Sequence, residues 1–404
     1  MDGRAGRLAD GTRAQRPVRA PAQRALRLDP DGAIFFFALF DFRNPRRIAH
    51  LDLLVLLSFG ISHAFFNAAN IGVSVPLYYP PLAYLLCRML YIGFKGSTAV
   101  LNPSLTRTGL RWAIVLCCVL ALFRVAINIA DSGVIDVGYA GVIGADQITD
   151  AEPIYGEGVF PEDNPTGDTY GPANYFAYVP FEQVFNWSGS WDELPAAHAA
   201  ALLFDLLTLA GLIVLGRRLS GNRLAVTLAL AWLAYPYTDF VLQSNSNDSL
   251  LAALLIWAFV LLARPLARGA LLAVAFTAKF APLALAPLML AGDRGLIALL
   301  RGRQSPKPVL LATAAFVVVS ALFLAHPLID PGFSVFWERT LKSQLDRVSP
   351  FSIWGQADLE PLQTLCKIGT VALAAIAAFV PAKRHLGRLA ALAAAVMILS
   401  LIHI

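Results

Sequence analysis

The chain has 404 residues, of which 57% are hydrophobic and only 15% are charged, and its mean hydropathy is +0.61. Soluble globular chains carry about a quarter charged residues, so this composition excludes an ordinary soluble domain and indicates an integral membrane protein. The formal net charge of +5 lies in segments beside long apolar runs. Such a distribution indicates membrane orientation, and we expect no nucleic-acid partner.

Residues 1–50 are predicted to form a basic cytoplasmic tail. The first 32 residues are rich in Arg, Ala, Asp and Gly and show no apolar period, which is typical of a segment without a packed core. No short charged region followed by an apolar stretch and a small-residue cleavage site is present, so we expect no cleavable signal peptide.

Residues 51–404 are predicted to form an all-α, polytopic transmembrane domain. A spanning helix needs about 20 apolar residues, and backbone amides inside lipid must be satisfied within the segment. The apolar runs show no alternation of the kind that a membrane barrel needs. We predict about nine full spans: 51–73, 77–94, 112–130, 196–215, 224–242, 250–263, 309–328, 365–380 and 389–404.

Lys and Arg residues assign the sides of the membrane. The basic connections are predicted to be cytoplasmic, and with them the N-terminus of a multi-pass cell-membrane protein. Residues 131–195 hold twelve carboxylates and no Lys or Arg, which predicts a large external loop. Residues 329–364 fall on the same external side. The basic connections are the tail and residues 95–111, 216–223, 264–268, 292–307 and 382–388.

Residues 269–291 lie between two basic segments that are both predicted to be cytoplasmic. The stretch must therefore enter the membrane and return on the same side. It has Lys279 and Pro282 at its middle. We predict two short helices in a re-entrant arrangement, which is tolerated where protein or a cavity surrounds the break.

Charged groups also lie within predicted spans. Arg124 falls in the third span and Asp205 about two turns into the fourth, on the helix face that also carries His198. Charges at this depth should face protein or water, because their burial in lipid costs several kcal/mol. An Arg–Asp clamp between helices and a functional role are both consistent with the pattern.

The external loop is dense in Tyr, Gly and Pro, so we expect it to be ordered. Its charge alone favours a solvated outer loop, but that explanation does not account for so much Tyr, Gly and Pro beside the carboxylates. Ser244 to Ser249 form a polar hinge that either caps the next helix or contributes to a site. Cations return late in the chain, at Arg339, Lys342 and Arg347. Cations that face an anionic loop favour a phosphate-bearing substrate.

Several patterns are absent from the sequence. It has no Gly-rich phosphate loop, no Ser/His/Asp triad signature, and no Cys or His pair at metal-ligand spacing, so we expect neither a metal nor another cofactor. The four cysteines lie in apolar segments and are expected to be free thiols: Cys87, Cys117, Cys118 and Cys366. The chain ends within an apolar run, from which we expect a longer natural protein.

The order of these motifs resembles the GT-C superfamily of membrane glycosyltransferases, in particular the bacterial family 87 enzymes that use polyprenyl-phosphate mannose. The resemblance covers about residues 112–355. Two departures stand out: the family's catalytic loop usually follows the first span, whereas here two further spans precede the span that leads into the acidic loop, and the C-terminal spans are fewer. The elements that carry it are Asp136 to Tyr139, Glu152 to Tyr155, Tyr170 to Pro172, Asn245 to Asp248, Lys279 to Pro282 and Ser349 to Gly355.

The resemblance implies transfer of a sugar from a polyprenyl-phosphate donor to a lipid or glycan acceptor on the external face, with inversion. It implies that Asp136 acts as the general base. Asp131 and Asp168 compete with Asp136 for this role. Each also has a structural explanation, because Asp131 ends the third span and Asp168 is a turn residue. Binding to the substrates is expected of Tyr139, Asp168, Tyr170, Asn245, Asn247, Asp248, Lys279, Arg339, Lys342 and Arg347.

Two other functions remain open from the sequence. A transporter or a lipid or glycan flippase would use Arg124, Asp205 and Lys279 to line a path, although the internal repeats common in transporters are not evident. A loop of 65 residues is also long for a transporter connection. A non-catalytic assembly subunit is the third alternative.

Overall fold

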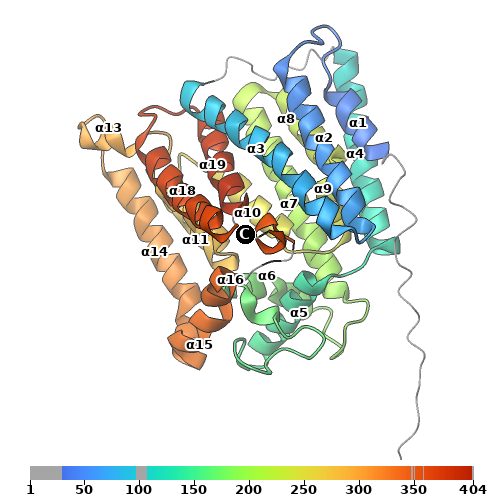
Figure 1. The fold of residues 1–404 in the computed structure, drawn as a ribbon, viewed down its shortest axis with the longest axis vertical. Coiled ribbons are helices and arrows are strands. Elements are labelled where there is room, and N and C mark those ends of the chain that lie inside the picture. Colours follow the sequence, from blue (N-terminus) through green and yellow to red (C-terminus); the bar gives the residue numbers. More distant parts are fainter. Residues whose placement is uncertain (1–29, 97–106, 347–348, 350, 358, 403–404) are drawn as a thin grey trace, which may run out of the picture.

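The computed structural model describes residues 30–96, 107–346, 349, 351–357 and 359–402. Over these residues the backbone forms helices and turns, and the one β contact is an isolated bridge between Arg294 and Lys383. The fold class predicted from the sequence, an all-α bundle with apolar spans, is therefore confirmed (Figure 1).

The first four described helices are α1 (Pro30–Leu39), α2 (Ile48–Asn67), α3 (Ile71–Lys95) and α4 (Arg107–Asp131). Helices α2 and α3 pack against each other as a hairpin. Polar groups connect α2 to α3 within their apolar surroundings. Arg88 Nε lies 3.0 Å from Asp52 Oδ1, and the Tyr84 hydroxyl donates to the same oxygen at 2.7 Å. This ion pair fixes the two helices against each other without leaving a charge unpaired.

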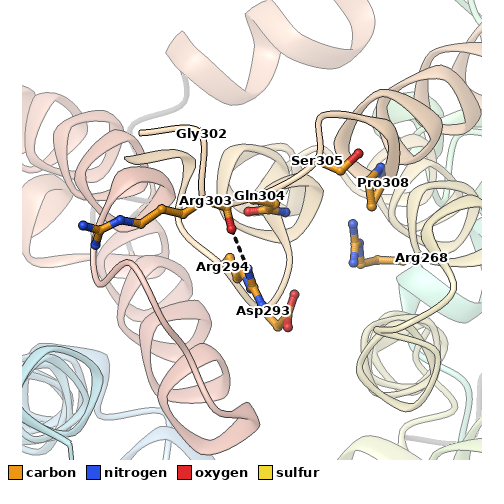
Figure 2. Close-up of a pocket in the computed structure, with 9 residues that line it drawn as sticks. Arg268, Asp293, Arg294, Gly302, Arg303, Gln304, Ser305 and Pro308 are labelled. Carbon is orange, nitrogen blue, oxygen red and sulfur yellow. Dashed lines mark hydrogen bonds between the residues drawn. The ribbon is translucent and has the colours of Figure 1, made fainter. Parts of the chain in front are cut away.

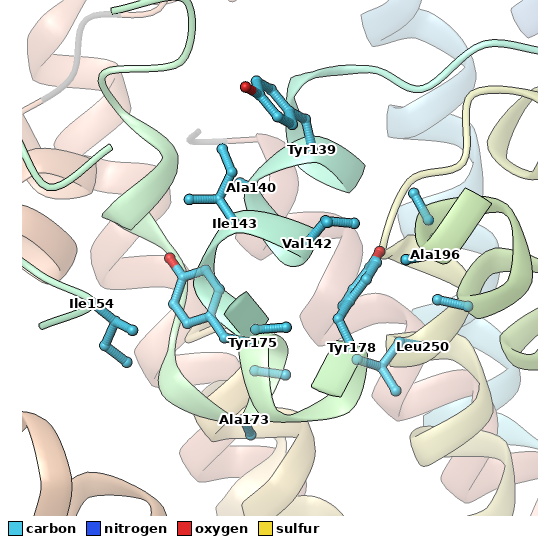
Figure 3. Packing of buried hydrophobic residues seen from close by; sticks show 14 of the residues in the cluster. Tyr139, Ala140, Val142, Ile143, Ile154, Ala173, Tyr175, Tyr178, Ala196 and Leu250 are labelled. Carbon is cyan, nitrogen blue, oxygen red and sulfur yellow. The ribbon is translucent and has the colours of Figure 1, made fainter. Parts of the chain in front are cut away.

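The predicted acidic loop is ordered. It contains α5 (Asp136–Thr149), the 3₁₀ turn η1 (Gly167–Thr169) and α6 (Pro172–Glu182), and α5 packs against α6 at one end of the molecule (Figure 1). Figure 3 shows how the rings of Tyr175 and Tyr178 fill the space beside α5. A Cβ atom on Gly144 would lie 2.2 Å from the Tyr175 ring, so glycine is required for this approach.

The middle of the chain contains one long span and one bent span. Helix α7 (Pro195–Ser220) is long and apolar enough to cross a membrane. The predicted span 224–242 is instead divided into α8 (Asn222–Ala234) and α9 (Pro236–Gln243), which meet at 59°. Pro236 explains the break, because proline cannot donate the helical hydrogen bond and restricts the residue before it. Helix α10 (Asp248–Val260) follows.

The predicted re-entrant stretch is broken where Lys279 was expected to break it. Helix α11 (Pro265–Ala278) ends at Lys279, whose backbone is extended, and the 3₁₀ turn η2 (Ala281–Leu285) and α12 (Ala286–Ala291) follow. Arg268 Nη2 near the start of α11 donates to the Leu290 carbonyl at 3.2 Å. The chain therefore enters and returns to the same level, although α11 begins at Pro265 and not at Gly269.

The C-terminal third contains α14 (Lys307–Pro327), which runs along the side of the molecule from α13 to α15 (Figure 1). The described residues of 329–364, predicted as an external loop, are largely helical, and short helices follow α14 as far as Leu345 after a kink at Asp330, whose backbone is extended. The remaining elements are α13 (Leu296–Leu300), η3 (Leu328–Gly332), α15 (Phe333–Trp337), η4 (Glu338–Lys342), α16 (Ser343–Asp346), α17 (Ile353–Gln356), α18 (Glu360–Phe379) and α19 (Leu386–Ile402).

Fewer helices than predicted qualify as full spans. Within the described residues, five helices are long and apolar enough to cross a membrane, or six if the bent pair α8–α9 counts as one. The prediction of about nine spans counted α3, α10 and α19 as well. Helices α10 and α19 have only 13 and 17 residues, and α3 carries three prolines within its length.

The deep charges of the third and fourth predicted spans form a clamp between helices. Arg124 Nη2 lies 3.1 Å from Asp205 Oδ1 and donates to the Thr238 carbonyl at 2.8 Å. Trp232 Nε1 donates to the same Asp205 oxygen at 2.8 Å. The Arg–Asp clamp was one of the two predictions for these residues, and the structure supports it.

Candidate functional site

The polar turn between α9 and α10 is one place where the acidic loop, residues 131–195, is attached to the bundle. Ile135, just before α5, donates its N–H to the Ser244 carbonyl at 3.1 Å. Asn245 has a left-handed backbone with φ of 50° and is fully buried. A Cβ atom on Gly138 would lie 2.3 Å from the Asn245 carbonyl oxygen, so α5 is in direct backbone contact with the turn.

Asn245 uses its side chain to hold this junction. Its Nδ2 donates to Ser132 Oγ at 3.1 Å and to the Gly133 carbonyl at 3.0 Å, and its Oδ1 accepts from Asn128 Nδ2 at 2.8 Å. All of its side-chain hydrogen-bonding capacity is directed at the protein. In this structure Asn245 positions the start of the loop.

Asp136 is the first residue of α5 and its side chain is exposed. Asn164 Nδ2 donates to the main-chain carbonyl of Asp136 at 2.9 Å, which fixes the backbone and leaves the carboxylate to the solvent side. Because Ile135 and Gly138 both contact the 244–245 turn, Asp136 lies between two residues that touch it. A carboxylate in this position is accessible to an incoming hydroxyl group.

Lys279 lies at the break between α11 and η2, where the α11 tip meets the loop. The Gly171 N–H donates to the Ala278 carbonyl at 3.1 Å. The Lys279 ammonium pairs with the Asp248 carboxylate and lies 5.8 Å from the centre of the Tyr170 ring. Both charged side chains retain exposure, 25% for Lys279 and 53% for Asp248, so the pair is open to solvent.

Beside this pair, a set of buried polar atoms has no hydrogen-bond partner among the residues that the structure describes. Asn247 Nδ2 donates to Asn174 Oδ1 at 2.6 Å, which leaves the other amide atom of each residue without a partner. The Ser249 and Tyr178 hydroxyls are also buried without one. Buried polar groups are nearly always hydrogen-bonded, so these atoms indicate a place for water or a polar ligand.

The tyrosines of the loop are held in their protonated form. Burial, together with the nearby Asp248 carboxylate, raises the pKa of Tyr178 above its ordinary value. Burial also raises the pKa of Tyr155 and of Tyr175, whose hydroxyls donate to the Tyr170 carbonyl at 2.9 Å and the Gly167 carbonyl at 2.7 Å. These hydroxyls therefore act as hydrogen-bond donors that shape the loop.

Asp168 and Arg339 form a second ion pair, which joins the loop to the helices after α14. Arg339 Nε and Nη2 donate to the two Asp168 oxygens at 2.5 and 2.8 Å, and Nη2 also donates to the Pro165 carbonyl. The Asp168 side chain is 0% exposed, and its Oδ2 also accepts from the Gly156 N–H. The carboxylate is fully committed to protein donors.

The other predicted binding residues lie apart from this geometry. Tyr139 is fully buried and packs against the rings of Trp191 and Trp187, 4.8 and 6.0 Å from its own, and burial raises its pKa to about 12. Its place is in the loop core (Figure 3). Lys342 is exposed, and Arg347 lies outside the described residues.

Sequence reasoning missed Asn174 and Tyr178, and it named Ser246 only as part of the 244–249 hinge. Ser246 Oγ donates to Asp248 Oδ2 at 3.0 Å, and Asn174 contacts Asn247. Asn174 lies four residues after Tyr170 at the start of α6, so a polar residue in the first turn after Gly-Pro was the available signal. Among the described residues, no group of three or more His, Cys, Asp or Glu is arranged to hold a metal ion.

No protein-family model matches the chain, and no curated protein sequence matches it. A search of solved structures found a similar helix arrangement in the crystal structure of ArnT from Cupriavidus metallidurans bound to undecaprenyl phosphate. The TM-score is 0.45 and the sequence identity is 17%. The match covers 74% of this chain and 60% of the ArnT chain, so this chain spans less than two thirds of that protein.

Proposed function

We propose that this protein is a membrane glycosyltransferase of the GT-C type. It transfers a sugar, mannose or a similar hexose, from a polyprenyl-phosphate donor to a hydroxyl of a lipid or glycan acceptor. The observation that supports it is the arrangement around the 244–248 turn. The exposed Asp136 lies between two residues that contact the 244–245 end of the turn, and the Lys279 ammonium pairs with Asp248 at the other end.

The two groups suit the two ends of an inverting displacement. Asp136 takes the proton of the acceptor hydroxyl as its oxygen attacks the anomeric carbon. The bond from that carbon to the phosphate oxygen breaks, and the polyprenyl phosphate leaves with the electron pair. Lys279 stabilises the charge that develops on the leaving phosphate, which is the kind of contribution that preorganised cations make. The donor is already activated, so the mechanism needs no further cofactor.

Asp136 is preferred to the other acids because of what each carboxylate already binds. Asp168 accepts three hydrogen bonds and is fully buried, so it has no free oxygen for a hydroxyl proton. Asp248 is paired with Lys279. A general base needs hydrogen-bond reach to the proton that it removes, and an exposed carboxylate at the start of α5 meets that condition.

The flippase alternative receives less support. Arg124 and Asp205, the charges that would line a path, are directed at each other and at the Thr238 and Trp232 groups. Both side chains are nearly fully buried, at 3% and 6% exposure. They therefore hold helices together, and only Lys279 of that trio remains open to a substrate.

The test is an assay of purified protein with radiolabelled polyprenyl-phosphate sugars and a lipid extract, followed by detection of a new glycolipid. Asp136→Asn keeps the shape and removes the basicity, so turnover should fall by about 10²- to 10⁴-fold while donor binding persists. Lys279→Met should reduce both donor binding and turnover, because it removes the cation from the site.

The matched control is Glu162→Gln, an exposed acid of the same loop. It should leave turnover near the wild-type value. Near-normal turnover of Asp136→Asn beside a folded but inactive Asp168→Asn would move the base to Asp168. Absence of any glycolipid from the wild type with every donor offered would reject the proposed function.

A further inference from the structure

The end of the molecule opposite α5 and α6 contains a cavity of about 540 Å³. It lies between the start of α11, the connection that follows α12, and the start of α14 (Figures 1 and 2). The side chains around it are mainly cationic and polar, with one carboxylate among them. The lining residues include Arg268, Asp293, Arg294 and Arg303.

Arg268 is the buried cation of this cavity, with 4% of its surface exposed. Its Nη1 donates to the Leu262 carbonyl at 2.6 Å and its Nη2 to the Leu290 carbonyl at 3.2 Å. Its Nε is buried without a hydrogen-bond partner among the described residues. Figure 2 shows the Arg268 side chain directed into the cavity. An unpaired buried donor on a cation is costly, so a missing acceptor is expected there.

Arg294 supplies a second cation to the cavity. Its Nη1 donates to the Arg303 carbonyl at 2.7 Å, which holds the guanidinium at the cavity wall and leaves other N–H groups to its interior. The Arg303 side chain leads away from the cavity in Figure 2. Asp293 offsets part of this charge, so Arg268 and Arg294 together leave an excess of positive charge in the cavity.

A basic connection at a predicted cytoplasmic surface has a simpler explanation, because Lys and Arg accumulate there in any multi-pass protein. That explanation accounts for exposed and solvated cations such as Arg301. It does not account for a guanidinium that is 4% exposed, turned toward a cavity and short of one acceptor. Guanidinium groups match phosphate oxygens in geometry and charge.

We propose that this cavity binds a phosphate-bearing anion, held by Arg268 and Arg294. The phosphate belongs either to the headgroup of an anionic lipid or to a free phosphate compound, since both present the same oxygens. Helix α14 has 21 residues and begins beside the cavity, so at 1.5 Å per residue the cavity lies about 30 Å from the far end of that helix. The site is therefore independent of the glycosyl-transfer proposal.

Binding can be measured on the purified, delipidated full chain. In one arm, inorganic phosphate is titrated at constant ionic strength with chloride as the comparison, and the melting temperature is recorded. In the other arm, retention of phosphatidylglycerol is measured by native mass spectrometry against phosphatidylcholine. We expect one or both ligands to bind the wild type. A response to the lipid alone would identify the ligand as a lipid headgroup. A response in both arms would show that the site also admits free phosphate.

Variants separate the cavity from the general charge of this surface. Arg268→Gln and Arg294→Gln should each weaken binding by about tenfold or more, because each removes a charge-assisted hydrogen bond. Arg301→Gln removes the same charge from a neighbouring exposed position and should leave affinity unchanged. Asp293→Asn should tighten binding several-fold, since it removes the opposing carboxylate, and a folding defect cannot imitate this gain.

Two results would overturn the proposal. One is the absence of binding by either ligand to the wild type. The other is an equal loss of affinity in Arg301→Gln and Arg294→Gln, which would assign the effect to surface charge. If Arg268→Gln does not fold, Arg294→Gln and Asp293→Asn decide the matter by themselves.

Discussion

The ion pair between Asp168 and Arg339 joins a carboxylate with no exposure to a guanidinium whose side chain is 31% exposed. The two partners are therefore not equivalent. Removing Arg339 leaves a buried carboxylate without its cation, which is costly, whereas removing the Asp168 charge leaves a guanidinium that water can reach. We expect Arg339→Met to lower the free energy of unfolding by about 3 kcal/mol and Asp168→Asn to lower it by less.

Melting temperatures in detergent would measure this difference, with Lys342→Met as the control from the same segment. Lys342 is exposed and should tolerate the loss of charge. An equal effect at Asp168 and Arg339, or a larger one at Asp168, would contradict the stated burial of the pair.

Two carboxylates of the loop should respond to pH in opposite directions. Burial, with Glu182, Asp150 and Glu152 nearby, raises the pKa of Asp146 above its ordinary 3.8. Its folded state then binds a proton more tightly than the unfolded chain does. The stability from this group is present below pH 3.8 and is lost as the pH rises through its raised pKa. Asp146→Asn should therefore melt at a higher temperature at pH 7, with the gain shrinking toward pH 4.

Asp192, on the same loop, should show the opposite dependence of stability on pH. Hydrogen bonds from the Ser188 hydroxyl and the Leu194 N–H lower its pKa. The stability that Asp192 contributes to the fold is present above pH 3.8 and is lost only as the pH falls through the lowered pKa. Asp192→Asn should thus melt at a lower temperature than the wild type at pH 7. Shifts of the same sign for both variants would show that these environments are assigned wrongly.

At the scale of elements, the contact between the α11 tip and the start of α6 determines where Lys279 lies. A Cβ atom on Gly171 would be 2.0 Å from the Thr277 carbonyl oxygen. Because this oxygen belongs to the backbone, no flexible side chain can move aside to make room. Gly171→Ala should separate the two elements, cost about 1–3 kcal/mol of stability and displace Lys279 from Asp248. Turnover should fall with it.

Gly133→Ala is the matched control, because a Cβ atom on Gly133 meets nothing within 4 Å. It lies in the same loop and should retain stability and turnover. Full activity of Gly171→Ala would mean that the position of the α11 tip does not matter for the reaction.

At the scale of the whole molecule, sidedness decides which end meets which compartment. We expect the α5–α6 end outside the cell and the α13 end in the cytoplasm. In a background without the four cysteines, Ser188→Cys should react with an impermeant thiol reagent in intact cells. Arg301→Cys, exposed beyond α13, should react only after lysis. Labelling in the reverse order would invert the topology and exclude an external reaction.

Much of the fold and part of the site could be predicted from the sequence, where the cause is local. Long apolar runs indicate helices because lipid satisfies no backbone amide. The break at Lys279 followed from a charge and a nearby Pro282 inside an apolar stretch, and α11 ends at that residue. The prediction that residues 131–195 are ordered followed from their Tyr, Gly and Pro content, and helices α5 and α6 confirm it.

The tertiary structure alone decided which groups meet and which remain free. Asp168 and Arg339 are 171 residues apart in the chain, and nothing in either segment shows that they pair. Asn245 is a predicted substrate-binding residue, and only the structure shows that its side chain contacts Asn128 and Ser132. The predicted span 224–242 is divided into α8 and α9, because hydropathy does not show where the helix bends. Helix formation and helix breaks depend on neighbouring residues, so the sequence by itself determines them. Pairing and burial of side chains depend on distant parts of the chain, so only the packing of the tertiary structure determines them.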